Sequence, residues 1–286
     1  MSAAADPMRE NYLHCERLVR GQDHDRYIAT LFAPAEHRDA LLALYAFGVE
    51  IARIRDAARE ALPGEIRLQW WREALQGLRD GEAAAHPVAA AVRETLGRYG
   101  FVAEPLLELI EARTFDLYDE PMASLGDLEL YAIRTQSPIF AMASGILGGG
   151  KRPPELATLD AAIAHTIGAI LSGLGRHAAR GQLYVPLEIL GRHEAAAADV
   201  YAGRTNPALL KALADMRRIA REHLAAARAR LAAAPSAIRP ALLPLALLGP
   251  TLRRMERRGY DPFRFEPIAP WRRQWLLWRA ARRGAF

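Results

Sequence analysis

Residues 41–56 read LLALYAFGVEIARIRD, and the apolar residues of this stretch recur every three or four positions. Such spacing is typical of a helix with one apolar face. That face contains Leu41, Leu44, Tyr45, Gly48, Ile51 and Ala52, and it ends at Arg55. Because Pro34 precedes the pattern, we expect the helix to begin near Ala35. The stretch predicts a core helix that ends among charged residues.

The same spacing predicts helices through the rest of the chain, and no alternating run typical of a strand is present. The expected helices cover residues 66–78, 87–99, 104–117, 125–145, 156–174, 208–233 and 241–258. Pro138 is a candidate interruption, and Pro244 and Pro250 are candidate kinks. The breaker-rich residues 148–154 are long enough for only one loop. We therefore expect an all-α fold in a single domain, residues 1–286, with residues 267–286 as a basic, tryptophan-rich C-terminal helix.

Composition narrows the class of protein. The chain has 286 residues, one cysteine (Cys15) and a net charge of +5, so a disulfide framework and a multi-cysteine metal site are excluded. Residues 1–10 do not resemble a secretory signal, and no apolar run is long enough to span a membrane. We expect a cytoplasmic protein, at most peripheral at the inner face of the cytoplasmic membrane. A basic chain suits nucleic acid, anionic lipid or a diphosphate, but no nucleic-acid-binding motif is present, so we expect no nucleic-acid partner.

Three stretches, in this order, resemble landmarks of the squalene/phytoene synthase family. They are Arg38 with residues 44–47 (LYAF), residues 68–72 (LQWWR) and residues 181–186 (GQLYVP). The resemblance extends over about residues 12–280. It implies the isoprenoid synthase fold, in which one helical domain encloses a hydrophobic channel. It also implies aspartate motifs on two facing helices, whose carboxylates hold the Mg²⁺ that helps a diphosphate leave.

The first aspartate motif of that family has the form Tyr-Ala-Phe-Cys-Arg-x-x-Asp-Asp-x-x-Asp, and residues 45–56 stand in its frame. Tyr45 is retained, but Ala52 and Arg53 replace two acids and only Asp56 remains. On a continuous helix, Glu50 and Asp56 would lie on different faces, so Glu50 does not restore the site. Arginines at these positions would repel a metal ion.

The second motif has the form Asn-x-x-x-Asp-x-x-x-Asp, followed by Gly-Arg-x-Tyr-x-Pro. Ala169, Gly173 and His177 stand at its three positions, and Gln182 replaces the arginine before Tyr184. The resemblance thus implies a vestigial site without catalytic residues, metal or other cofactor. We expect that site to comprise Tyr45, Glu50, Ala52, Arg53, Asp56, Ala169, Gly173, His177, Gln182 and Tyr184.

Several other residues have two interpretations. Tyr45, Phe47, Trp70 and Trp71 would line a prenyl channel in an active relative, but aromatic residues at helical spacing are more often core. Arg38 is either an anion contact or a surface residue.

Glu111, Arg113 and Asp116 resemble a Glu-x-Arg-x-x-Asp landmark of the family. A solvated or inter-helix ion pair between Arg113 and Asp116 also explains them.

The C-terminal residues 271–283 combine tryptophan with arginine. On a helix, Trp271, Trp275 and Trp278 form one stripe, and Arg272, Arg279 and Arg283 form a neighbouring one. This combination suits a membrane interface. Alternatively, the tryptophan stripe docks onto the core.

The loss of acids resembles one branch of the family, which includes an assembly factor of respiratory complex I. This resemblance implies a protein without catalysis that acts in assembly of a membrane respiratory complex. Expected partners are subunits or assembly intermediates of such a complex, a lipid or isoprenoid ligand, and the membrane surface. The alternative is an active head-to-head prenyl transferase that uses Mg²⁺ with Asp56, Glu50, Asp116 or Asp119.

Overall fold

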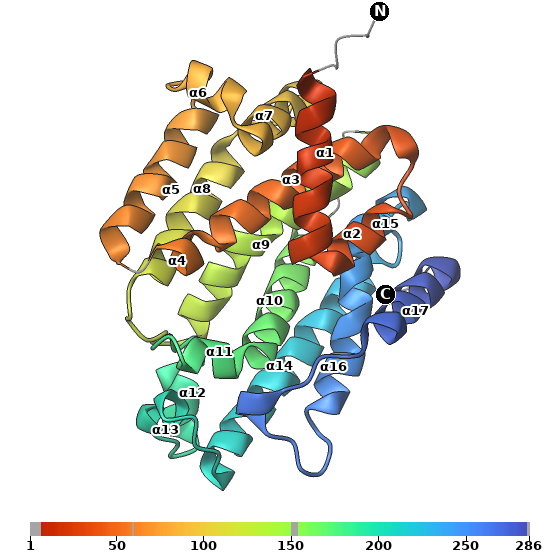
Figure 1. Ribbon diagram of the computed structural model, residues 1–286. Helices are drawn as coiled ribbons and strands as arrows, with labels where there is room; N and C mark the ends of the chain where they lie inside the picture. Colours follow the sequence, from red (N-terminus) through yellow and green to blue (C-terminus); the bar gives the residue numbers. More distant parts are fainter. Residues whose placement is uncertain (1–6, 59, 150–153, 285–286) are drawn as a thin grey trace, which may run out of the picture.

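The structure is a computed structural model that describes residues 7–58, 60–149 and 154–284. Within these ranges the chain forms helices and connecting turns and no strands, as the fold class predicted. Most of the breaker-rich loop, residues 150–153, lies outside the described residues. In Figure 1, α9 (Leu125–Leu147) and α10 (Glu155–Ser172) run through the middle of the bundle. On one side lie α5 (Ala61–Leu75) and α8 (Glu104–Ala112), and on the other lie α14 (Pro207–Leu231), α16 (Leu248–Arg254) and α17 (Pro270–Arg283).

The N-terminal third surrounds the helix that the opening stretch predicted. That helix, α3 (Ala35–Ala52), begins at Ala35, and every residue from Ala40 to Phe47 is buried. It packs against α1 (Pro7–Gln22), α7 (Pro87–Tyr99) and α9 (Leu125–Leu147). Because neighbours cover it on several sides, it is a central helix rather than a surface helix with one apolar face.

α3 ends earlier than a continuous motif helix would. Arg53 has φ −91° and ψ −4°, and a separate short helix, α4 (Ile54–Ala57), carries Asp56. The prediction that Glu50 and Asp56 lie on different faces of one helix was therefore wrong in its premise. The two acids belong to different helices.

Capping signals place some of the other helices accurately. α7 has the predicted bounds and ends at Gly100, whose φ of 64° is the left-handed conformation that glycine tolerates. α5 (Ala61–Leu75) begins earlier than expected, and α6 (Asp80–Ala85) was not predicted. The predicted helix at 104–117 is α8 (Glu104–Ala112), followed by the 3-10 turn η1 (Arg113–Leu117). α9 passes through Pro138 without a break.

Helices of the second half are more fragmented than predicted. α10 (Glu155–Ser172) ends before Gly173 and is followed by α11 (Leu174–Ala178), α12 (Leu187–Arg192), α13 (Ala197–Tyr201) and α14 (Pro207–Leu231). The predicted helix at 241–258 divides into α15 (Arg239–Leu242), η3 (Leu243–Leu247) and α16 (Leu248–Arg254). Pro240, Pro244 and Pro250 lack the N–H groups that a continuous helix needs.

α10 holds the two halves of the fold together by packing against α9, α14 and α16. A Cβ on Gly168 would overlap the side chain of Leu248, so this glycine permits the close approach of α16. The buried Asp160 of α10 pairs with Arg230 and lies 2.8 Å from the His223 ring, both on α14. α10 is therefore held against α16 by a close apolar contact and against α14 by a buried charge that has partners.

The C-terminal helix α17 (Pro270–Arg283) docks by its leucines. Leu276 and Leu277 are buried against α2 (His24–Thr30) and η3, whereas Trp271, Trp275 and Trp278 are 71%, 47% and 47% exposed. Docking through the tryptophan stripe was therefore a wrong alternative. None of the helices formed by the described residues is both long enough and apolar enough to cross a bilayer.

Candidate functional site

A cavity of about 430 Å³ lies where the ends of α3, α4 and η1 approach α9, α10 and α11. Residues from both frames of the resemblance line it: Ala52, Arg53 and Asp56 from the first, and Ala169, His177, Gln182 and Tyr184 from the second. The remaining three expected site residues do not line this cavity. Tyr45 is buried in the core, Gly173 forms the turn between α10 and α11, and Glu50 faces a neighbouring cavity of about 460 Å³.

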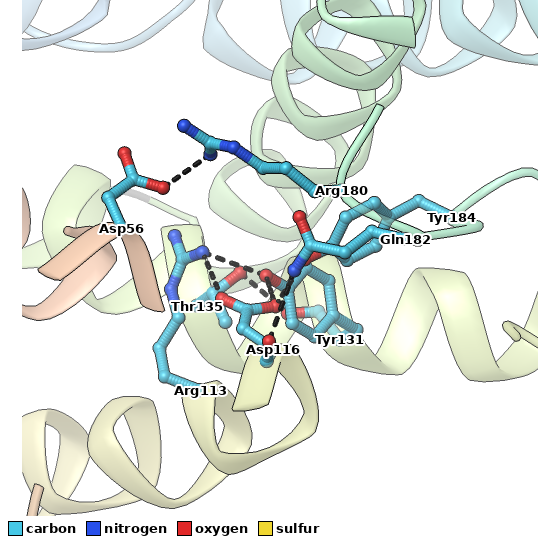
Figure 2. Close-up of polar contacts among 8 residues, drawn as sticks. All are labelled: Asp56, Arg113, Asp116, Tyr131, Thr135, Arg180, Gln182 and Tyr184. Carbon is cyan, nitrogen blue, oxygen red and sulfur yellow. Dashed lines mark hydrogen bonds and ion pairs between the residues drawn. The ribbon is translucent and has the colours of Figure 1, made fainter. Parts of the chain in front are cut away.

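The carboxylate of Asp116 is the most highly connected acid of the cavity (Figure 2). Its Oδ1 accepts hydrogen bonds from the hydroxyls of Tyr131 and Tyr184, both at 2.7 Å, and its Oδ2 lies 2.9 Å from Nη1 of Arg113. The predicted ion pair with Arg113 is confirmed, but Asp116 is buried and both residues belong to η1, so the interpretation of the pair as solvated or inter-helix was wrong. The pair lies within η1 and connects to α9 and to the 181–186 segment.

Gln182 belongs to the same cluster. Its Nε2 donates to the backbone carbonyl of Asp116 at 3.1 Å and to the Tyr184 hydroxyl at 3.3 Å. Nearby, the backbone N–H of Met122 donates to the carbonyl of Leu183, and the N–H of Leu187 donates to the carbonyl of Met122. These bonds hold the 181–186 segment in place, so Gln182 is already occupied by structural contacts.

Burial determines the protonation of the tyrosines in this cluster. Burial, and then the negative charge of Asp116, raises the pKa of Tyr184 far above its ordinary value. Burial likewise raises the pKa of Tyr131, against the opposing effect of Arg113. Both hydroxyls therefore remain protonated and act as donors to Asp116.

Two further acids are paired with arginines that line the cavity. Asp56, the last acid of the first frame, forms an ion pair with Arg180, from the turn after α11 (Figure 2). Asp119 lies 3.1 Å from Nη2 of Arg55. Both ion pairs are partly exposed, so each contributes little to stability. In each pair, however, the carboxylate already has an arginine as its partner.

Arg26 and Gln136 line the cavity and were not predicted as site residues. Arg26 is 8% exposed, pairs with Asp23 at 3.0 Å and donates to Oε1 of Gln136 at 2.9 Å. Its guanidinium also lies over the Tyr45 ring, 5.3 Å from the ring centroid. Arg26 lies on α2, a helix that was not predicted. Its charge within a helical segment was the only feature of the sequence that could have marked it.

The lining carries more positive than negative charge. Six arginines (Arg26, Arg53, Arg55, Arg113, Arg176 and Arg180) and three aspartates (Asp23, Asp56 and Asp116) line the cavity, a difference of three positive charges. Within the described part of the chain, Arg53 and Arg176 have no carboxylate partner. The cavity is therefore suited to a polyanionic group.

Two histidines of the lining are neutral at neutral pH. Burial lowers the pKa of His165 to about 4, and burial together with Arg176 lowers the pKa of His177 to about 4. His177 lies edge-on to the Tyr184 ring, with a centroid distance of 4.9 Å. Because His165 lies on α10 and His177 on α11, they do not share one continuous helix.

The acids of this cavity do not fit the Mg²⁺ that the fold family implies. Mg²⁺ binds through carboxylates, waters and substrate phosphates in octahedral geometry. Here Asp23, Asp56 and Asp116 each contact an arginine, and a metal ion would have to displace that cation. In the described ranges, no three His, Cys, Asp or Glu side chains are grouped as metal ligands would be.

Arg38 lies away from the cavity lining. Its Nε donates to the carbonyl of Ala33 at 2.9 Å, and its Nη2 donates to the carbonyl of Leu31 at 3.0 Å. Tyr45, Phe47 and Trp71 are buried, in accord with their interpretation as core. Trp70 is half-buried, and its Nε1 donates to Glu82.

We expect Asp116→Ala to lower the free energy of unfolding by about 3–5 kcal/mol, because it leaves the Arg113 charge, whose side chain is 16% exposed, without its carboxylate partner. Urea denaturation measures the change. Asp119→Ala is the matched control, since Asp119 is 70% exposed and its loss should change little. Equal effects of the two substitutions would contradict the buried role of Asp116.

Acid should destabilise the protein through His177. The unfolded chain binds a proton at this residue below about pH 6.5, and the folded chain binds it only below about pH 4. Between these values the unfolded state carries more protons, so the free energy of unfolding falls as the pH falls. In urea titrations at a series of pH values, His177→Gln should make this dependence less steep. An unchanged pH dependence would contradict the lowered pKa.

Curated proteins of two kinds are similar to the chain. One is the "NADH dehydrogenase (ubiquinone) complex I, assembly factor 6" of Rattus norvegicus, 28% identical over 264 residues that cover 92% of this chain and 79% of that protein. The human protein of the same name is 26% identical, over 87% of this chain and 75% of its own length. The phytoene synthase of Arthrospira platensis is 24% identical, over 94% of this chain and 91% of its own length.

Solved structures agree on the fold. The squalene synthase HpnC from Alicyclobacillus acidocaldarius has a TM-score of 0.77 and 24% identity, over 90% of this chain and 97% of its own. A dehydrosqualene synthase in complex with ligand has a TM-score of 0.83 and 16% identity, over 97% and 99% of the two chains. The family model for squalene/phytoene synthase matches residues 19–279. By that match and this fold, the chain belongs to the squalene/phytoene synthase family.

Proposed function

We propose that this protein acts by binding, without metal-dependent prenyl transfer, and that it works in the assembly of a membrane respiratory complex of the complex I type. The observation that carries the proposal is the pairing of each cavity aspartate with an arginine. Ionising an allylic diphosphate requires carboxylates that are available to Mg²⁺. The likeness to the rat and human proteins named as complex I assembly factors supports the role in assembly.

The cavity supports a particular class of ligand, a phosphate or diphosphate group on a lipid or isoprenoid. Arg53 and Arg176 offer positive charge toward the group, and the apolar side chains of Val49, Ile139 and Ile170 line the same space. Thr166 Oγ1 is buried in the lining without a hydrogen-bond partner. A polar head held by arginines, with an apolar tail beside it, would satisfy both kinds of lining.

A turnover assay separates this proposal from the enzyme alternative, which the likeness to phytoene synthase favours. Purified protein incubated with farnesyl or geranylgeranyl diphosphate and Mg²⁺ should release no diphosphate above a protein-free control. Diphosphate release that disappears in Asp56→Asn would establish the prenyl transferase and overturn the proposal.

Complementation tests the role in assembly. Deleting the gene should reduce NADH:quinone oxidoreductase activity in membranes and leave subcomplexes on native gels. A chromosomal copy carrying Asp56→Asn should restore assembly, because this change leaves the cationic cavity in place. A copy carrying Arg53→Glu with Arg176→Glu should fail, and the matched pair Arg257→Glu with Arg258→Glu, on an exposed turn, should succeed. Normal assembly in the deletion strain would contradict the role.

A further inference from the structure

The outward face of α17 exposes three tryptophans, Trp271, Trp275 and Trp278. With about 100° between successive helix residues, Trp271, Trp275, Trp278 and Arg282 fall in one sector, opposite the buried Leu276 and Leu277. The leucines anchor the helix to the protein, so the tryptophans point away from the core. Figure 1 shows α17 at the margin of the molecule.

This face is also strongly basic. α17 contains five arginines and no acid. Arg273 contacts the protein, with its Nε 2.9 Å from Oδ1 of Asp25, and it fixes the helix on α2. Arg279 and Arg282 instead stack against the indoles of Trp275 and Trp278, at 4.6 Å and 5.0 Å from the ring centroids. Such stacking arranges cation and indole side by side on the exposed surface.

A separate cavity of about 330 Å³ lies beside the C-terminal end of α17, remote in sequence from the family site. Its apolar lining comes from Phe32, Pro240, Leu243, Ala280 and Ala281. Two arginines, Arg239 and Arg282, also line it, together with Ser236 and Gly284. A Cβ on Gly284 would overlap the Arg239 guanidinium, so Arg239 lies against the end of the helix.

We propose that this face and its cavity bind the surface of an anionic phospholipid bilayer, with α17 parallel to the membrane plane. Indole rings favour headgroup depth, and arginines in the same layer meet lipid phosphates. The cavity would receive the phosphate of one lipid at Arg239 and Arg282. The part of an acyl chain nearest the headgroup would lie against Phe32 and Leu243. The inference does not depend on the proposed function, because it concerns a surface away from the arginine-rich cavity between α3 and α11.

Vesicle sedimentation tests the inference with the full chain. Vesicles of phosphatidylcholine mixed with phosphatidylglycerol should sediment the protein, and vesicles of phosphatidylcholine alone should sediment much less. Tryptophan emission should shift to shorter wavelength on binding, and acyl chains brominated near the headgroup should quench it. These optical signals report Trp271, Trp275 and Trp278, because Trp71 is buried and Trp70 is half-buried.

Charge and apolar contact can be tested separately. Each arginine near an anionic surface contributes roughly fivefold in affinity, so Arg272→Glu with Arg282→Glu should weaken binding by at least about twentyfold. The pair Arg257→Glu with Arg258→Glu changes the net charge equally on another surface and should have a much smaller effect. Trp275→Ser with Trp278→Ser should abolish most of the emission shift. Leu62→Ser with Ile66→Ser, two exposed residues of α5, should leave it intact.

Several outcomes would overturn the inference. Equal binding to both kinds of vesicle would contradict a preference for anionic lipid. Absence of binding to either kind would contradict binding to a membrane. Loss of binding in the Arg257 and Arg258 pair equal to that in the Arg272 and Arg282 pair would assign the effect to net charge alone. Circular dichroism of each variant confirms folding, which these exposed substitutions should preserve.

Discussion

A buried carboxylate must be satisfied by donors, and in this protein that constraint falls on Asp116. Arg113, Tyr131 and Tyr184 satisfy it from η1, from α9 and from the 181–186 segment. Removing any of these donors would leave the buried acid partly unpaired, so the three segments are held in one arrangement. The same bonds fix one face of the cavity. They also engage the Asp116 carboxylate with donors from the protein.

Pairing of acids with arginines explains the rest of the cavity. Asp56 is held by Arg180 and Asp23 by Arg26, whereas Arg53 and Arg176 have no acid beside them in the described residues. The family motifs have acids in the frames that include Arg53 and His177. Here the cavity instead carries excess positive charge. Such a cavity attracts an anion directly, whereas a carboxylate site attracts it through a metal. Under the proposed function, arginine side chains would therefore meet the ligand in place of a metal ion.

Local signals predicted the elements that depend on local physics. Pro34 marked the start of α3, and Gly100 the end of α7, because capping is decided by neighbouring residues. The end of α3 at Ala52 and the helices α1 and α2, which pack against α3, were not predicted, since tertiary packing decides them. The orientation of α17 was equally inaccessible. Its leucines and tryptophans are both apolar, and only the docked structure shows that the leucines face inward.

The candidate site was predictable as a set of missing acids but not as a network. Ala52, Arg53, His177 and Gln182 could be identified from spacing and resemblance, and they do surround one cavity. Asp116 could not be assigned its role, because two of its three partners lie 15 and 68 residues away.

The most direct test of the account is calorimetric titration with inorganic diphosphate, in EDTA and again in Mg²⁺. We expect binding in EDTA that weakens in Arg53→Glu with Arg176→Glu, and binding that required Mg²⁺ and vanished in Asp56→Asn would contradict a metal-independent cavity.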